Sequence, residues 1–360
     1  MAIALVLLGA SDVAHAQATF DLPVACDGCR LRWTRQVTLQ GDWSDGGLTG
    51  AYEGASRFAT GQWAVIDARA EMVYRFDRDG KYIGPLAPKG AGPRELQSPV
   101  AIIRTRADST MVLDRGNARF NIYDPEGRWV REGRWMGLAP GRALVRASGT
   151  FVTGERIGTR SSFGMPLHEW SPNAELIRSF GSKSDEAVRT PGEVPLVRVP
   201  TAALQDGSFW TIDANAPRLR KWTSEGALAD EWLIPLKGNV VYHNLADVRT
   251  PTFEFYGIEH YAGDVVLVVM AFHDRRAVEA FGESRYVDGG TSRAIEDWGR
   301  FLDTRIIALD VRRRAVLATL DLDELLFQPV GRRTFFAIAP GGDNGILQFG
   351  TLEFTRPLSP

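Results

Sequence analysis

The sequence predicts an all-β fold, a six-bladed β-propeller of four-stranded antiparallel blades whose last blade is closed by an N-terminal strand. Three observations support this prediction. One strand-to-turn junction recurs along the chain, a further hairpin precedes each junction, and the C-terminal strands lack one partner. A radial array of this kind forms one domain, so we expect residues 31–360 to be a single propeller.

A strand that ends in a polar turn recurs five times. Two of these junctions are Phe76-Asp77-Arg-Asp-Gly80 and Tyr123-Asp124-Pro-Glu-Gly127. From residue 77 to 124 and from 124 to 171 is 47 positions each, and from 171 to 223 is 52. A period near 45 with four short strands per unit is typical of propeller blades. Similar junctions begin at Trp170, Trp222 and Leu309.

The fifth blade is longer than the others. From residue 223 to 310 is 87 positions, which predicts an insertion at 273–303. Residues 276–281 and 292–301 have the pattern of short helices, with Gly289 and Gly290 between them. The insertion either covers the mouth of the central channel as a lid or packs on the rim.

We predict that the last blade is built from both ends of the chain. The C-terminus supplies three expected strands, at Thr334–Ile338, Gly345–Gly350 and Leu352–Arg356. The stretch Gln36–Gly41 lies 46 residues before Tyr82 and is expected to play the same role as the strand there. A strand from the N-terminus would close the ring and remove an exposed sheet edge.

The first 16 residues predict a signal peptide. An apolar run is followed by Ala14-His15-Ala16, an Ala-x-Ala pattern that precedes cleavage and places the mature N-terminus at Gln17. No basic residue precedes the run, so the natural start is expected several residues upstream. We therefore expect an exported protein, periplasmic or extracellular.

Residues 17–30 form an N-terminal segment that contains both cysteines of the chain, Cys26 and Cys29. In an oxidising compartment, a C-x-x-C pair favours a small local disulfide. A redox-active pair would need a helix after it, whereas residues 31–39 are strand-like. Haem attachment would need His where Arg30 stands, and zinc would need two further ligands nearby.

The overall composition excludes some partners. The chain has 360 residues, of which 44% are hydrophobic, and a formal net charge of −2. This balance does not favour nucleic acid or an anionic membrane. No apolar run reaches the ~20 residues that a transmembrane helix needs. We expect a monomer without a transmembrane segment.

Two stretches resemble a known family. Val112–Gly127 resembles the NHL repeat, with Asp114, Asn117 and Arg119 between two strands. Lys89–Pro99 resembles the Gly-x-Gly-Pro-Gly-Glu-Phe-x-x-Pro loop of bacterial six-bladed, TolB-like propellers. Such propellers include binding scaffolds, lactonases and a lyase, so the resemblance implies a fold and not one activity.

The loop departs from that pattern at two positions. Arg94 stands where the family has the glycine after its proline, and Leu96 stands where it has phenylalanine. The family motif described above is complete only in the first two blades.

Long loops are expected to gather on one face. They connect the middle strand pairs and successive blades, at 87–98, 156–165, 182–198, 235–251 and 273–303. Binding surfaces usually lie where long loops share one rim of a rigid scaffold. The hypothesis is therefore an exported scaffold that binds a protein, peptide or glycan on this face. Its candidate residues are Lys89, Arg94, Arg156, Arg160, Arg198, Arg249 and His273.

The alternative is a metal-dependent hydrolase or lactonase with a cation at the channel mouth. Calcium or zinc would be held by Glu155, Asp213 and His260. No catalytic motif or cofactor signature is evident, so the catalytic residues remain unknown. Acids at strand ends, Asp67 and Asp114 among them, more often cap backbone N–H groups. A third alternative is a purely structural component of the cell envelope.

Overall fold

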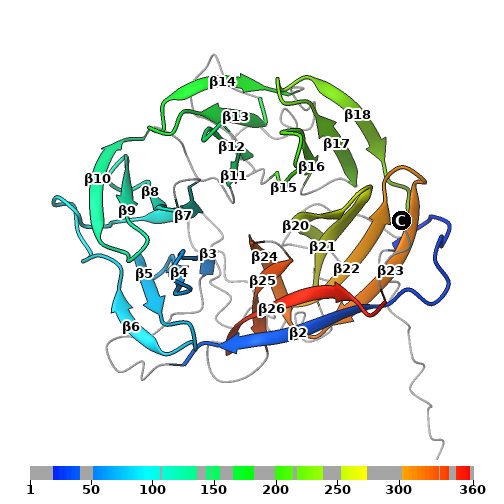
Figure 1. Cartoon of the computed structure of the whole chain (residues 1–360), viewed down its shortest axis with the longest axis horizontal. Helices are drawn as coiled ribbons and strands as arrows, with labels where there is room; N and C mark the ends of the chain where they lie inside the picture. Colours follow the sequence, from blue (N-terminus) through cyan, green and yellow to red (C-terminus); the bar gives the residue numbers. More distant parts are fainter. Residues whose placement is uncertain are drawn as a thin grey trace, which may run out of the picture.

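Six antiparallel sheets of four strands each form a ring around a central axis (Figure 1). The all-β, six-bladed prediction is confirmed: among the residues whose structure is described, every regular element is a strand and none is a helix. No described segment is therefore a helix that could cross a bilayer. The computed structural model describes residues 19–40, 52–105, 108–135, 143–146, 148–154, 165–181, 199–213, 217–237, 253–273, 302–331, 333–339 and 346–356.

In blades one to five, the first strand in the chain lies nearest the axis and the fourth lies outermost, and each strand pairs with the next. Blade one is β3 (Tyr52–Arg57), β4 (Trp63–Asp67), β5 (Met72–Phe76) and β6 (Tyr82–Pro85); blade two is β7 (Pro99–Arg104), β8 (Thr110–Asp114), β9 (Arg119–Tyr123) and β10 (Trp129–Arg134); blade three is β11 (Ala143–Val145), β12 (Phe151–Gly154), β13 (Leu167–Trp170) and β14 (Leu176–Phe180); blade four is β15 (Thr201–Ala203), β16 (Phe209–Ile212), β17 (Arg218–Trp222) and β18 (Leu228–Leu233); blade five is β20 (Phe253–Ala262), β21 (Val265–His273), β22 (Leu302–Asp310) and β23 (Ala315–Leu322).

The sixth blade joins the two ends of the chain. Its strands, from the outside inward, are β2 (Leu31–Thr38), β26 (Ile346–Phe354), β25 (Thr334–Ala339) and β24 (Leu325–Gly331). The outermost strand β2 pairs with β26 so that Leu31 lies opposite Phe354, and Figure 1 shows the blue and red strands side by side. The prediction that an N-terminal strand closes the last blade is confirmed.

Two strand assignments in this blade were wrong. Gly345–Gly350 and Leu352–Arg356 are not separate strands, because β26 runs through Gly350 without a turn. The glycine allows the ring of Trp33 to approach: a Cβ on Gly350 would lie 2.5 Å from that ring. A strand glycine can mark either a turn or a close approach, and here it marks the second. The inner strand β24, in which the register shifts on either side of Pro329, was not predicted.

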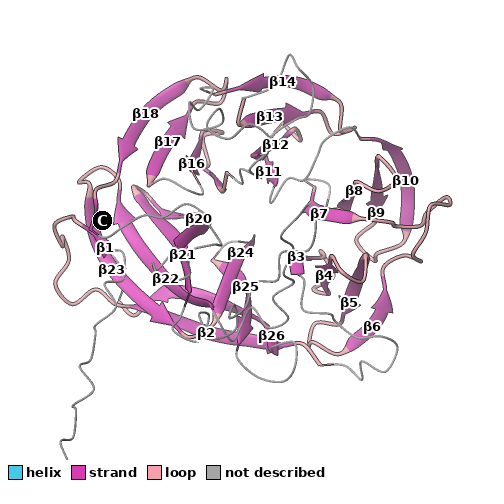
Figure 2. Ribbon diagram, turned by 180° about the vertical axis from the view of Figure 1, so that it is seen from behind, coloured by secondary structure: helices cyan, strands magenta, loops and turns pink. Residues whose placement is uncertain are grey.

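The segment before β2 runs along the outside of the ring (Figure 2). The short strands β1 (Thr19–Phe20) and β19 (Leu236–Lys237) pair with each other. Val24 then forms a parallel bridge with Val316 on β23, the outer strand of blade five. A disulfide joins Cys26 to Cys29, whose side chains pack against a core cluster that includes Leu31 and Leu317. The segment covers a sheet edge that would otherwise be open.

Apolar side chains fill the space between neighbouring blades. The second strands β4 and β8 are buried along their whole length, because a blade packs on both of its faces. At the junction of blades one and six, the rings of Trp63 and Phe349 stack with centroids 3.9 Å apart. Such a pair contributes roughly 0.5–1.5 kcal/mol beyond the apolar area that it buries.

A buried carboxylate links blades three and four. Glu169 lies 2.7 Å from a guanidinium nitrogen of Arg146 and 2.6 Å from one of Arg178. The same two arginines donate to the carbonyls of Ser224 and Glu225 in the next blade. Burial acts to raise the pKa of Glu169, but hydrogen bonds from Arg178 and Thr150, with the charge of Arg146, outweigh it and lower the pKa.

We predict that Gly350→Val weakens ring closure. The added side chain would collide with Trp33, and overpacking of this kind costs about 1–3 kcal/mol. The melting temperature should fall, as measured by circular dichroism. Gly331→Ala is the matched control, because a Cβ there meets nothing within 4 Å. Equal melting temperatures for the two variants would contradict the role given to the contact.

We predict that Glu169→Gln destabilises the protein by about 2 kcal/mol at neutral pH, because two arginines lose their counter-charge. The carboxylate's pKa is lowered in the folded state, so its contribution is present above the usual glutamate range and is lost as pH falls through the lowered pKa. The difference between variant and wild type should therefore shrink in acid. Urea titrations at pH 7 and pH 3.5 measure it, and a constant difference would contradict this account.

Candidate functional site

Strand direction assigns every connection to one of two faces of the ring. The short-turn face carries the turns within the inner and outer strand pairs of each blade, such as β3–β4 and β5–β6. The long-loop face carries the middle connections and the links between blades. Of the five long segments predicted on that face, only the loop 87–98 between β6 and β7 lies wholly within the described residues.

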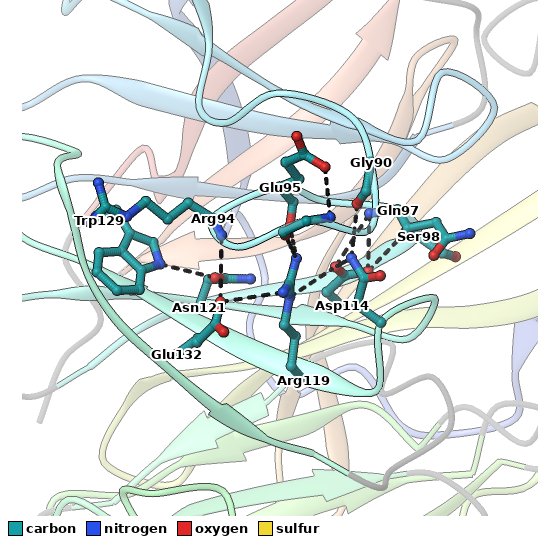
Figure 3. Close-up of polar contacts among 12 residues, drawn as sticks. Gly90, Arg94, Glu95, Gln97, Ser98, Asp114, Arg119, Asn121, Trp129 and Glu132 are labelled. Carbon is teal, nitrogen blue, oxygen red and sulfur yellow. Dashed lines mark hydrogen bonds and ion pairs between the residues drawn. The ribbon is translucent and has the colours of Figure 1, made fainter.

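The buried carboxylate of Asp114, at the end of β8, holds the loop 87–98 by hydrogen bonds (Figure 3). Its oxygens accept the backbone N–H of Ser98 at 2.9 Å and that of Gln97 at 3.3 Å. A third donor is Nδ2 of Asn117, at 2.7 Å. Asp67 caps Arg69 and Ala70 in the same way in blade one. These acids satisfy backbone donors, as the sequence suggested.

Two further side chains of the repeat motif hold the loop's carbonyl groups. Asn117 donates to the carbonyl of Gly90 at 3.0 Å. Arg119 donates to the carbonyls of Gly92 at 2.6 Å and Glu95 at 2.5 Å. The motif residues of one blade therefore fix the preceding inter-blade loop, and Figure 3 shows this for Asp114 and Arg119. Charge-assisted bonds to backbone groups are about twice as strong as neutral ones, so the loop has one preferred conformation.

Arg94 lies at the exposed tip of this loop in the left-handed backbone region, with φ at 64°. This region favours glycine and costs other residues about 1–2 kcal/mol. The guanidinium carbon of Arg94 lies 4.5 Å from the ring centroid of Trp129, a cation–π contact that offsets part of the cost. The indole nitrogen of Trp129 donates to Asn121 at 3.1 Å, which fixes the plane of the ring.

The remaining predicted ligand residues on this face are described only in part. The ammonium of Lys89 is exposed and lies 2.7 Å from the carboxylate of Glu71. His273 is the last residue of β21 and so belongs to the same face. Four predicted residues lie outside the described part of the chain: Arg156, Arg160, Arg198 and Arg249.

The structure separates two of the three predicted metal ligands. Asp213 follows β16 on the long-loop face and accepts from Arg220 at 2.8 Å. His260 lies near the β20–β21 turn on the short-turn face, with Nε2 at 2.9 Å from the carbonyl of Gly263. Glu155 lies outside the described residues. Within the described ranges, no three His, Cys, Asp or Glu side chains are grouped to hold a metal ion.

A cavity of about 1090 Å³ occupies the channel on the short-turn side. It is lined by the inner strand of every blade, which places it on the ring axis. Asp206 lines it from the β15–β16 turn and is held by hydrogen bonds from the hydroxyl and backbone N–H of Ser208, which lower the pKa of the carboxyl. Sequence reasoning directed attention to the other face and missed this cavity.

No protein-family model matches the sequence, and no curated protein is detectably similar to it. Among solved structures, a Bacteroides fragilis protein described as exported has a TM-score of 0.57 at 9% identity, over 91% of this chain and 96% of its own. A DUF4221-family member from Bacteroides vulgatus has a TM-score of 0.54 at 10% identity, over 91% and 99%. At these identities the likeness concerns the fold alone.

We predict that Asp114→Asn destabilises the protein by about 1–3 kcal/mol, because an amide cannot accept all three hydrogen bonds. Hydrogen exchange of the Gln97 and Ser98 amides should accelerate, as measured by mass spectrometry. The control is Asp124→Asn, in an exposed turn on the short-turn face. Unchanged protection of the loop 87–98 in the first variant would contradict the role of Asp114.

Proposed function

We propose that the protein is an exported, non-catalytic propeller that binds a protein, peptide or glycan partner through its long-loop face. The observation that carries this proposal is Arg94. A strained, charged residue stands where glycine would be favoured, at the exposed tip of a loop that a buried network holds still. Local strain of this kind is concentrated at functional sites, and a pre-organised loop loses little entropy on binding.

Export is supported by the apolar N-terminal run and the Ala-x-Ala pattern before Gln17. The proposal also assigns the chain to the NHL-like and TolB-like propellers, because Asp114, Asn117 and Arg119 act together on the glycine-rich loop. The chain is taken to act as a monomer, outside the cytoplasm, either in the periplasm or beyond the cell.

The test places a photo-crosslinking amino acid at Arg94 in the mature protein within its source cells. A crosslinked partner at this position is expected, whereas the same probe at Arg128, 75% exposed on the short-turn face, should give none. Glycan arrays would detect a partner that is a glycan rather than a protein. Crosslinks at position 128 but not at position 94, together with no glycan bound on the arrays, would contradict the proposal, because the binding surface would then lie on the short-turn face.

We predict that Arg94→Gly separates binding from stability. Glycine relieves the left-handed strain but removes the contact with Trp129, so the melting temperature should change by no more than about 2 °C. Partner binding should fall at least tenfold by surface plasmon resonance. Lys81→Gly, at an exposed position on the other face, is the control. Full binding by Arg94→Gly would overturn the assignment.

Metal content separates the proposal from a hydrolase. One calcium or zinc ion per chain after dialysis, lost on mutation of Asp213, would favour a metal-dependent enzyme instead. Measuring the metal content of a His260 variant as well would show whether the short-turn face takes part in holding the ion.

A further inference from the structure

Three arginines surround a second cavity of about 400 Å³ on the short-turn face. Arg57 ends the inner strand β3 of blade one, Arg78 lies in the β5–β6 turn of the same blade, and Arg104 ends the inner strand of blade two. Among the residues that the structure describes, no acidic side chain lines this cavity. Arg104 is paired with Asp108 at 2.7 Å, but Arg57 and Arg78 have no ion-pair partner within the described part of the chain.

The side chain of Arg57 is held in place by an aromatic ring. Its guanidinium carbon lies 4.7 Å from the centroid of Trp63, which is buried. The indole nitrogen of Trp63 lies 3.4 Å from the carbonyl oxygen of Arg78, in the β5–β6 turn. A stacked guanidinium keeps its N–H donors free for an anion, in a planar arrangement that matches carboxylate, sulfate or phosphate oxygens.

The three-arginine cavity opens beside the channel, because Arg104 lines both. The channel walls are mostly small or aliphatic, and they enclose enough volume for an organic molecule. The aliphatic and alanine side chains that line it are Ala55, Ala101, Ile102, Ile103, Ala143, Leu144, Val145, Ala203, Leu204, Ala262 and Val330. A chamber with a largely aliphatic wall and charged residues at its mouth therefore lies next to a basic one.

Charge is unevenly distributed around the channel mouth. The acids Asp206 and Glu259 line it from blades four and five, whereas Arg104 and Arg333 line it from blades two and six. The guanidinium of Arg333 stacks on Tyr261 at 4.0 Å from the ring centroid. An anionic group would be repelled from the acidic side and attracted toward blades six, one and two.

We propose that the short-turn face binds an amphipathic organic anion. Its terminal carboxylate, sulfate or phosphate contacts Arg57, Arg78 and Arg104, and its apolar body lies in the channel. The site is independent of the partner surface on the long-loop face. It uses different residues, at the other end of the channel. A result that contradicts one of the two proposed sites therefore leaves the other untouched.

The experiment titrates the mature protein with hexanoate, octanoate and decanoate by isothermal calorimetry, below micelle formation. One site per chain is expected, with affinity rising several-fold for each two added methylenes, because each buries further apolar surface. Acetate tests the anionic group alone, and decyl maltoside tests the chain without its charge. Both should bind at least tenfold more weakly than decanoate, and added salt should weaken decanoate binding.

The paired variant Arg57→Gln/Arg78→Gln should weaken decanoate binding at least tenfold. Arg32→Gln/Arg312→Gln makes the same change in net charge at two exposed positions outside both cavities. That control should bind like wild type. Equal weakening by both pairs, affinity independent of chain length, or tight binding of decyl maltoside would each overturn the proposal. Replacing decanoate by decyl sulfate and decyl phosphate then identifies the preferred anionic group.

Discussion

The pairing of β2 with β26 is the constraint on which the rest of the structure depends. Without it the ring would have two free sheet edges, and the blade faces at the junction would meet water instead of each other. The contact is strengthened where Trp33 covers Gly350 and donates to Glu324 at 2.7 Å. The channel cavity needs the same closure, because inner strands of all six blades line it.

Turn chemistry made most of the fold predictable. An aspartate, serine or threonine before a tight turn has a fixed local task, so junctions such as Asp77–Gly80 recur in blades one to four, whatever the core around them. The sixth blade lacked this signal in part. Its inner strand β24 contains Pro329, and Gly350 serves a contact with Trp33 that lies almost the whole chain away. A local pattern cannot report a neighbour so distant in sequence.

The candidate sites were predictable to different degrees. Arg94 was recognisable as a departure from a glycine-rich loop, and the structure shows the physical reason, a positive φ. Arg57 and Arg104 end the inner strands of two neighbouring blades, whereas Arg78 lies in an outer turn, so the three residues share no motif and meet only through the ring geometry. The signal that could have found them is their common place, each at or next to a turn on the short-turn face.

The closing strand has a consequence for synthesis. Because β2 precedes all six inner strands in the chain, it leaves the ribosome before them, yet its partner β26 emerges after all of them. Blades one to five can form in turn while β2 waits unpaired, a free strand edge open to association with other chains. We expect the chain to depend on chaperone protection of its N-terminal region until β26 has paired with β2, and truncation before β26 to release an aggregation-prone open ring.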